Sequence, residues 1–139
     1  MVVALLKSHK YVDLIIPRGG DALMKSVSQH ATIPVLKHDK GVCHMYVDSD
    51  VDLEMAQRLS VNAKVQRCST CNALETLLVH EKIARKLLVP LGKILAEKGV
   101  EVRGCPKTCQ SIPEAKPAQE DDFGQEFLSL TLAIKVVRD

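Results

Sequence analysis

Four of the five cysteines stand in two short pairs whose spacing could support chemistry. Cys68 and Cys71 form the first pair, and Cys105 and Cys109 form the second, later along the chain. Paired thiolates of this kind can bind a structural zinc ion, form a redox couple, or leave one thiol as a nucleophile. The residues around each pair help to decide among these three chemistries.

A zinc site would use all four of these thiolates. Structural zinc pairs usually stand on tight turns, whereas Cys71 runs directly into Asn72-Ala-Leu-Glu-Thr76. With 46% hydrophobic residues, the chain can also build a core without a metal. We therefore expect no metal ligand among the site residues. A zinc-binding interaction module that uses Cys68, Cys71, Cys105 and Cys109 is kept as an alternative function, and metal analysis would test it.

The order of the predicted elements disfavours a redox couple. In thioredoxin-like proteins such a pair stands at the start of a helix that follows a strand, whereas here it follows a helix and precedes a strand. A nucleophilic thiol would benefit from the positive charge of Arg67, and the N–H groups around Cys71 and Asn72 could stabilise an oxyanion. Composition alone still favours Cys71 as a small buried apolar residue.

A glycine turn, Pro17-Arg18-Gly19-Gly20, lies between an apolar run and a predicted helix. In this arrangement the N–H groups of a helix N-terminus can meet a phosphate, and glycine lets a ligand approach the backbone. Two glycines are fewer than the full dinucleotide-binding fingerprint has, so an ordinary turn between strand and helix is the alternative.

Two histidines are further candidates for a site. His38 lies in a predicted loop between strands, and loops at strand ends often carry functional residues. His44 lies inside a predicted strand, where a structural role is more common. His38 is therefore the better candidate for chemistry.

These residues must be positioned by a fold in which strands and helices alternate. Apolar runs predict strands over residues 11–16, 33–37, 42–47, 76–79, 100–103 and 127–137, the first of them buried. Helical spacing predicts helices over residues 2–8, 21–30, 51–65 and 82–98, with Asp21 and a residue of 48–50 as N-caps, Pro90 as a kink or break, and Gly99 as a C-terminal cap. Residues 104–122 are predicted to be a loop with at most a short strand. The alternation predicts an α/β fold with a largely parallel sheet.

Composition excludes several classes of function. Aromatic residues make up 3% of the chain and the net charge is +2, which gives neither base-stacking platforms nor a basic surface for nucleic acid. No apolar run approaches the roughly 20 residues of a membrane span. Five cysteines without a secretory leader favour a reducing compartment, so we expect a cytoplasmic protein with no nucleic-acid or membrane partner. Both ends of the chain interrupt an element, which favours a segment of a longer protein.

Several motifs recur along the chain in a characteristic order. They are residues 12–20 (VDLIIPRGG), 38–48 (HDKGVCHMYVD), 62–67 (NAKVQR), 71–79 (CNALETLLV) and 123–137 (FGQEFLSLTLAIKVV). Together they resemble the γ-glutamyl phosphate reductases of the aldehyde dehydrogenase superfamily. The resemblance covers nearly the whole chain, and CNALET is its most specific part.

This resemblance implies a fold and a reaction. Residues 1–37 would be the C-terminal part of a Rossmann-like nucleotide-binding domain, and residues 38–139 would form a three-layer α/β/α catalytic domain of the aldehyde dehydrogenase type. The family reduces L-glutamyl 5-phosphate to L-glutamate 5-semialdehyde and phosphate, in proline biosynthesis. The implied cofactor is NADPH, with NADP as its oxidised form.

The resemblance also implies roles for single residues. Cys71 would be the nucleophile that forms a thioester, with Asn72 and His38 in the catalytic set and Cys68 as a bystander. His38 falls where ordinary aldehyde dehydrogenases have a glutamate base, which a reductase of an acyl phosphate does not need. The other assignments are Arg18, Gly19 and Gly20 to the cofactor, and Arg67 and His44 to the substrate.

Members of the family are much longer than this chain. The resemblance therefore implies that most of the nucleotide-binding domain and an upstream oxyanion asparagine lie outside it. We expect the chain alone to be inactive and to associate with the missing parts or to form a homo-oligomer. A non-catalytic remnant of the reductase is a further alternative.

Overall fold

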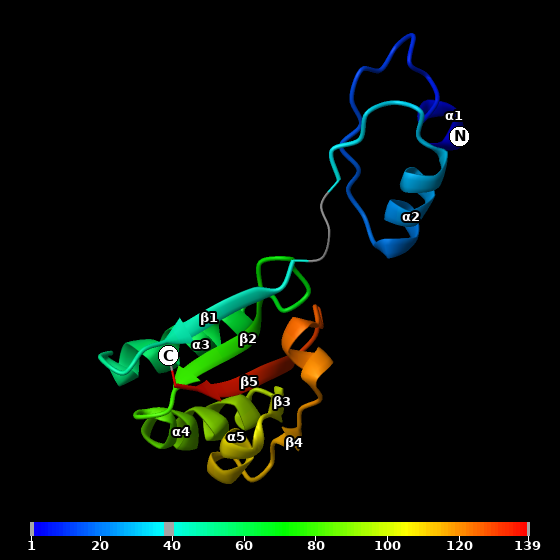
Figure 1. Ribbon diagram of the computed structural model, residues 1–139. Coiled ribbons are helices and arrows are strands. Elements are labelled where there is room, and N and C mark those ends of the chain that lie inside the picture. The colour runs from blue at the N-terminus through cyan, green and yellow to red at the C-terminus, as the bar shows by residue number, and fades with distance from the viewer. Residues whose placement is uncertain (1, 38–40, 139) are drawn as a thin grey trace. The chain divides into compact units, whose positions relative to one another are not determined.

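The computed structural model describes residues 2–37 and 41–138. The chain forms two compact units, Met1–Asp39 and Lys40–Asp139 (Figure 1). No helix within the described ranges is long and apolar enough to cross a membrane.

The first unit contains two helices and one short strand contact. Helix α1 is Val2–Leu5, which is shorter than the predicted 2–8, and α2 is Asp21–His30, with the bounds that the sequence predicts. The predicted N-cap of α2 is wrong by one residue, because Gly20 holds the extended cap conformation and Asp21 is the first helical residue. The buried apolar residues in the described part of this unit are Leu6, Pro17, Val27 and Ile33.

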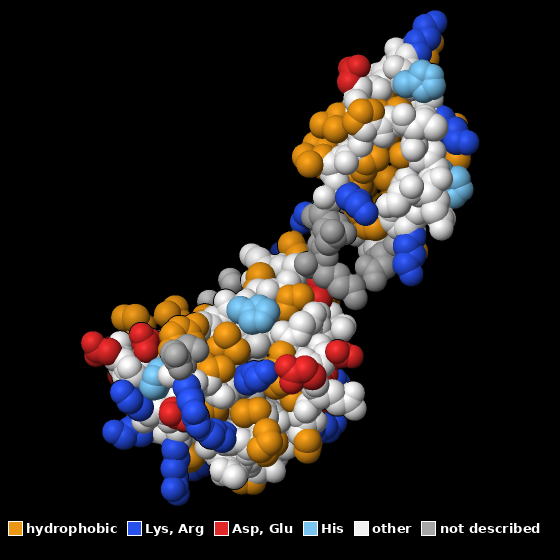
Figure 2. Space-filling model, in the orientation of Figure 1, with side chains coloured by type: hydrophobic (Ala, Val, Ile, Leu, Met, Phe, Trp, Pro, Cys, Tyr) orange, Lys and Arg blue, Asp and Glu red, His pale blue; other side chains and the backbone are white. Residues whose placement is uncertain are grey.

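The two strands predicted for the first unit, residues 11–16 and 33–37, are reduced to a single parallel bridge between Ile15 and Val35. Tyr11 is 79% exposed and Ile16 is 69% exposed, so the expectation of a buried strand over residues 11–16 is wrong for this chain. A run of apolar residues becomes a buried strand only where neighbouring strands and helices cover it. Figure 2 shows the resulting apolar side chains at the surface of this unit.

The second unit is built on a five-stranded sheet in which all paired strands are parallel. The strand order is β1-β2-β5-β3-β4. The strands are β1 Cys43–Val47, β2 Leu74–His80, β3 Glu101–Gly104, β4 Lys116–Pro117 and β5 Thr131–Val137. The α/β fold with a parallel sheet that the sequence predicts is confirmed for this unit.

Helices cover one face of this sheet (Figure 1). They are α3 Leu53–Val65, α4 Ala84–Glu97 and α5 Pro106–Ser111. The short 3₁₀ helix η1, Glu120–Gly124, lies against the opposite face, where the Thr76 hydroxyl donates to the carbonyl of Phe123 at 3.1 Å. Alternation of side chains along β2 separates these faces, since Thr76 points one way and Leu77 the other.

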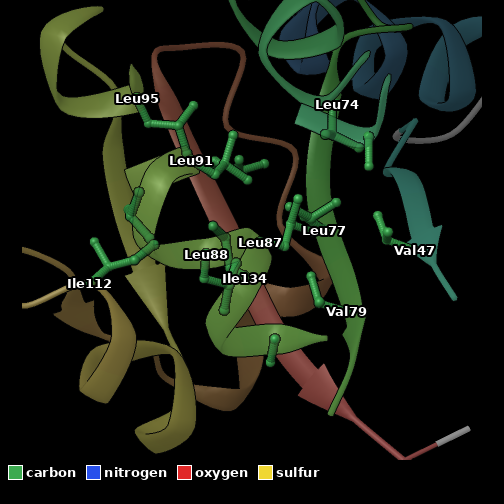
Figure 3. Packing of buried hydrophobic residues seen from close by; sticks show 14 of the residues in the cluster. Val47, Leu74, Leu77, Val79, Leu87, Leu88, Leu91, Leu95, Ile112 and Ile134 are labelled. Atoms are coloured by element: carbon green, nitrogen blue, oxygen red, sulfur yellow. The ribbon is translucent and has the colours of Figure 1, made fainter. Parts of the chain in front are cut away.

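The core is aliphatic, as the low aromatic content requires. Leu87, Leu88, Leu91 and Leu95 recur at helical spacing along α4, and all have 0% exposure. In Figure 3 this stripe packs onto side chains of the central strands, among them Leu77, Val79 and Ile134. This packing fixes β2 and β5 beneath α4 and gives the site a rigid support.

Helix α4 runs through Pro90 as one element, so the predicted break is absent. The predicted cap at its end is confirmed: Gly99 has φ +72°, and the next N–H, of Val100, donates to the carbonyl of Leu95 at 2.9 Å. The N-cap of α3 is Asp52, beyond the predicted 48–50, and its carboxylate accepts from the N–H groups of Glu54 and Met55.

The prediction of a loop over residues 104–122 is wrong in part. Helix α5, strand β4 and the start of η1 all lie within it. Pro106 opens α5, a position where proline is favoured because no helical hydrogen bond is lost. A helix of 6 residues spans too few turns to show a periodic apolar pattern, which is why the sequence did not reveal it.

Candidate functional site

Cys71 lies on an exposed loop between α3 and β2, here called the cysteine loop (residues 66–73). The N–H and the hydroxyl of Thr70 donate to the carbonyl of Arg67 at 3.3 and 2.8 Å, and the N–H of Ala73 donates to the carbonyl of Thr70 at 2.9 Å. Ala73 is buried, so the loop is anchored at its C-terminal end. The exposure of Cys71 argues against an inert core cysteine, which composition alone had favoured.

Two residues that the sequence analysis did not select, Gly41 and Cys43, lie against the backbone of Cys71, and a third, Glu126, lies beside Gly41. The Cys43 thiol donates to the Cys71 carbonyl at 3.4 Å. A Cβ atom added at Gly41 would lie 3.0 Å from that carbonyl oxygen, 3.8 Å from Cys71 Cβ and 3.7 Å from Glu126 Oε1. Because Gly41 has no side chain, both the cysteine loop and the Glu126 carboxylate can lie close to its backbone.

The sheet explains why these residues meet. The strands are parallel, so the amino ends of β1, β2 and β5 lie at one edge of the sheet. Cys43 begins β1, Cys71 precedes β2, and Glu126 precedes β5. Knowledge of the strand order would have been sufficient to bring them together, but the sequence does not state that order.

The other predicted site residues of this unit lie on the same loop or on the neighbouring strand. Arg67 and Asn72 are exposed on the cysteine loop. His44 is exposed on β1, directly after a register shift between Cys43 and His44. Its Nδ1 lies 2.8 Å from the carbonyl of Val42, which can only accept, so Nδ1 donates a proton in this hydrogen bond. His38 lies outside the described residues.

The glycine turn belongs to the first unit. Gly20 is the N-cap of α2, no side chain caps this helix, and a Cβ at Gly20 would meet no atom within 4 Å. A Cβ at Gly19 would lie 2.6 Å from Leu23 Cδ2, so Gly19 permits close packing of the turn on α2. Arg18 is exposed beside them. An uncapped helix start with open space before it suits an anion.

The two cysteine pairs lie at opposite edges of the sheet. Cys71 precedes the amino end of β2, whereas Cys105 follows the carboxyl end of β3. In a parallel sheet these ends face away from each other. In the described part of the chain, no three His, Cys, Asp or Glu side chains gather in a way that could hold a metal ion. The geometry gives no support to a zinc site shared by the four cysteines.

Cys105 has an environment of its own. Burial raises the pKa of its thiol, but its hydrogen bonds outweigh burial, among them the one with the Thr108 hydroxyl at 3.4 Å and the one from the Val136 N–H at 3.3 Å, so the pKa lies below its usual value. Cys105 is therefore the thiol against which any selective reaction of Cys71 must be compared.

Solved structures with this fold define the class of protein. Betaine aldehyde dehydrogenase from Staphylococcus aureus matches 99% of the chain with a TM-score of 0.74 at 13% identity. Gamma-glutamyl phosphate reductase from Thermotoga maritima matches 99% of the chain with a TM-score of 0.91 at 48% identity. The fold is that of the aldehyde dehydrogenases, as the sequence predicted.

Curated relatives indicate which enzyme of this class the chain resembles. Gamma-glutamyl phosphate reductase from Carboxydothermus hydrogenoformans is 54% identical over 135 residues, which is 97% of this chain and 32% of that enzyme. The Desulfatibacillum aliphaticivorans enzyme of the same name is 53% identical over 99% of this chain. The chain is thus homologous to one segment of the gamma-glutamyl phosphate reductases and spans about a third of their length. No family model matches it.

Proposed function

We propose that the chain is the cysteine-bearing segment of a reductase that converts L-glutamyl 5-phosphate to L-glutamate 5-semialdehyde and phosphate, in proline biosynthesis. The observation that carries this proposal is the exposed Cys71, held on a hydrogen-bonded loop at the edge of a parallel sheet. The proposal draws further support from relatives named gamma-glutamyl phosphate reductase that align with nearly the whole chain.

In the proposed reaction the Cys71 thiolate attacks the acyl carbon of the substrate. The bond from this carbon to the phosphate oxygen breaks, phosphate leaves, and a thioester forms on Cys71. NADPH, when bound, supplies the hydride that reduces the thioester carbon. The carbon–sulfur bond then breaks, which releases the aldehyde and restores the thiolate.

The chain would contribute three further functions to this chemistry. We assign the oxyanion to the N–H groups of Cys71 and Asn72, both of which are exposed on the cysteine loop. Arg67 and His44 would bind the substrate, with the Arg67 guanidinium on its phosphate. His38 stays in the proposed catalytic set through its family position.

The first unit would contribute to binding of NADPH. The open N-terminus of α2 fits a phosphate of the cofactor, with Gly19 and Gly20 permitting its approach and Arg18 adding positive charge. We accordingly interpret residues 1–37 as the C-terminal part of the nucleotide-binding domain and residues 38–139 as the catalytic domain. The enzyme would act in the cytoplasm, where its cysteines stay reduced, and would assemble with the remaining parts of the reductase or as a homo-oligomer.

We expect the chain alone to show no turnover with NADP, phosphate and glutamate semialdehyde, when formation of reduced cofactor is followed by absorbance. Catalysis needs the thiol, the oxyanion donors and the nicotinamide held together, and such positioning is worth roughly 7–11 kcal/mol of barrier. Clear turnover that disappears in Cys71→Ser would show that the missing parts are dispensable and would contradict this expectation.

The function itself is tested by a chimera. Residues 1–139 would replace the matching 33% of the Thermotoga maritima enzyme, which superposes with a TM-score of 0.91. We expect the chimera to reduce glutamyl phosphate with NADPH. A folded chimera that binds NADPH and glutamyl phosphate but does not reduce the substrate would favour the non-catalytic remnant.

Substitutions at Gly20 in this chimera test the nucleotide site. Gly20→Asn should raise the KM for NADPH on the order of tenfold, because the side-chain oxygen would cap the N–H groups that a phosphate needs. Gly20→Val should also raise the KM for NADPH, because its branched side chain would occupy the space through which the cofactor approaches the backbone. Gly124→Ala, at a second glycine with open space around it, is the matched control and should leave KM unchanged.

A purely structural turn predicts a different result. Asparagine is a favoured N-cap and valine a poor one, so Asn would stabilise α2 without affecting NADPH, and only Val would cause a defect. An unchanged KM in Gly20→Asn would therefore remove the turn from the cofactor site.

A further inference from the structure

A buried ion pair lies behind the cysteine loop. Lys64 Nζ is 2.6 Å from Glu75 Oε2, and the two side chains are 0% and 1% exposed. Lys64 is the penultimate residue of α3, and Glu75 is the second residue of β2. The pair therefore joins the two ends of the loop that carries Cys71.

The second oxygen of Glu75 reaches a third segment. Glu75 Oε1 accepts from the N–H of Leu128 at 3.1 Å. Leu128 has φ +52°, a left-handed conformation that is uncommon for a leucine and needs support from its surroundings. This N–H lies two residues after Glu126, whose carboxylate lies beside Gly41. One carboxylate thus connects α3, β2 and the segment that leads into β5.

Stability alone does not account for this pair. Desolvation of two charges commonly cancels their attraction, and apolar residues of similar volume often stabilise a protein equally well. A directional contact between two charged groups can instead fix the register of a strand. A slip of β2 by one residue would turn Glu75 to the opposite face and leave the Lys64 ammonium buried without a carboxylate. Cys71, four positions before Glu75, would move with it.

We propose that Lys64 and Glu75 are positioning residues for Cys71, which they hold in one register relative to Gly41 and Glu126. The proposal rests on the proposed function in taking Cys71 as the nucleophile. Both side chains are buried, so we assign them to positioning and not to the chemical steps. Their role is to keep the loop closed through turnover.

Hydrogen exchange in the chain itself tests the proposal without any need for activity. In the wild type, the Thr70 and Ala73 amides should exchange as slowly as those of β2, because the loop opens only with the sheet. Lys64→Met/Glu75→Gln removes both charges and keeps an amide oxygen for Leu128. In this variant we expect loop exchange to accelerate about tenfold or more, with α4 unchanged.

A matched control uses an exposed pair at the other edge of the sheet. Lys107 Nζ lies 2.8 Å from Glu81 Oε2, and Lys107→Met/Glu81→Gln should leave loop exchange unchanged. The proposal is overturned if wild-type loop amides exchange at the rate of an open surface loop, a result that needs no variant. Equal acceleration of loop and α4 in Lys64→Met/Glu75→Gln would also overturn it, because that pattern marks a general structural role.

The reductase chimera gives a second, separate readout. Lys64→Met/Glu75→Gln should lower kcat about tenfold or more with KM for both substrates within about twofold, since loss of positioning affects the reacting thiol rather than binding. An unchanged kcat would contradict the positioning role. An inactive unsubstituted chimera would instead count against the proposed function and would leave the exchange result standing.

Discussion

Cys71→Ser is expected to abolish turnover of the reductase chimera, with a loss of at least about 10⁴-fold in kcat. A serine hydroxyl is a much weaker nucleophile than a thiolate at neutral pH, and it cannot form the thioester. Binding of NADPH should persist, because the glycine turn lies in the other unit. Turnover by single-wavelength absorbance and cofactor binding by fluorescence titration would measure the two effects separately.

The other cysteines provide the controls. Cys68→Ser and Cys105→Ser should retain turnover in the chimera. With limiting iodoacetamide and peptide mapping, Cys71 should be labelled first in the folded chain, because it is the exposed thiol among the five. Cys105 is the informative competitor, since its hydrogen bonds lower its pKa while partial burial restricts access to it. Earlier labelling of Cys105 or Cys68 would count against Cys71 as the reactive thiol.

Lys64→Ala should lower the free energy of unfolding of the second unit by about 3–5 kcal/mol, because it leaves the Glu75 carboxylate buried without its cation. That is a large share of the roughly 5–15 kcal/mol that holds a typical domain together. Urea unfolding followed by far-ultraviolet circular dichroism would show the loss as a shift of the midpoint at unchanged slope.

Two control variants are needed to interpret the loss of stability in Lys64→Ala. Lys107→Ala removes an ammonium from an exposed pair, which solvent already screens, and should leave the urea midpoint nearly unchanged. Lys64→Met/Glu75→Gln removes both buried charges and should recover much of the stability lost in Lys64→Ala. If Lys64→Ala unfolds at the wild-type midpoint, the buried pair is energetically unimportant, and the reason for its burial would have to be sought elsewhere.

The sequence by itself determined the alternating α/β organisation and supplied a candidate nucleophile. Local signals were sufficient for helix α2 and for the glycine that ends α4, because helix spacing and a left-handed cap depend on neighbouring residues. The CNALET motif also selected Cys71 without reference to the fold, since such a motif is a contiguous string of residues. Short elements such as α5 were not predicted, because 6 residues are too few to show a periodic apolar pattern.

Only the tertiary structure decided what surrounds that cysteine. The order β1-β2-β5-β3-β4 brings Gly41, Cys43 and Glu126 to Cys71 and separates Cys105 from it, and strand order depends on crossovers between distant segments. The burial of Lys64 against Glu75 was equally hidden, because in sequence both are ordinary charged residues. Burial is a property of the assembled layers: a charge is removed from water, and an apolar run such as residues 11–16 is covered, only by segments that arrive from elsewhere in the fold.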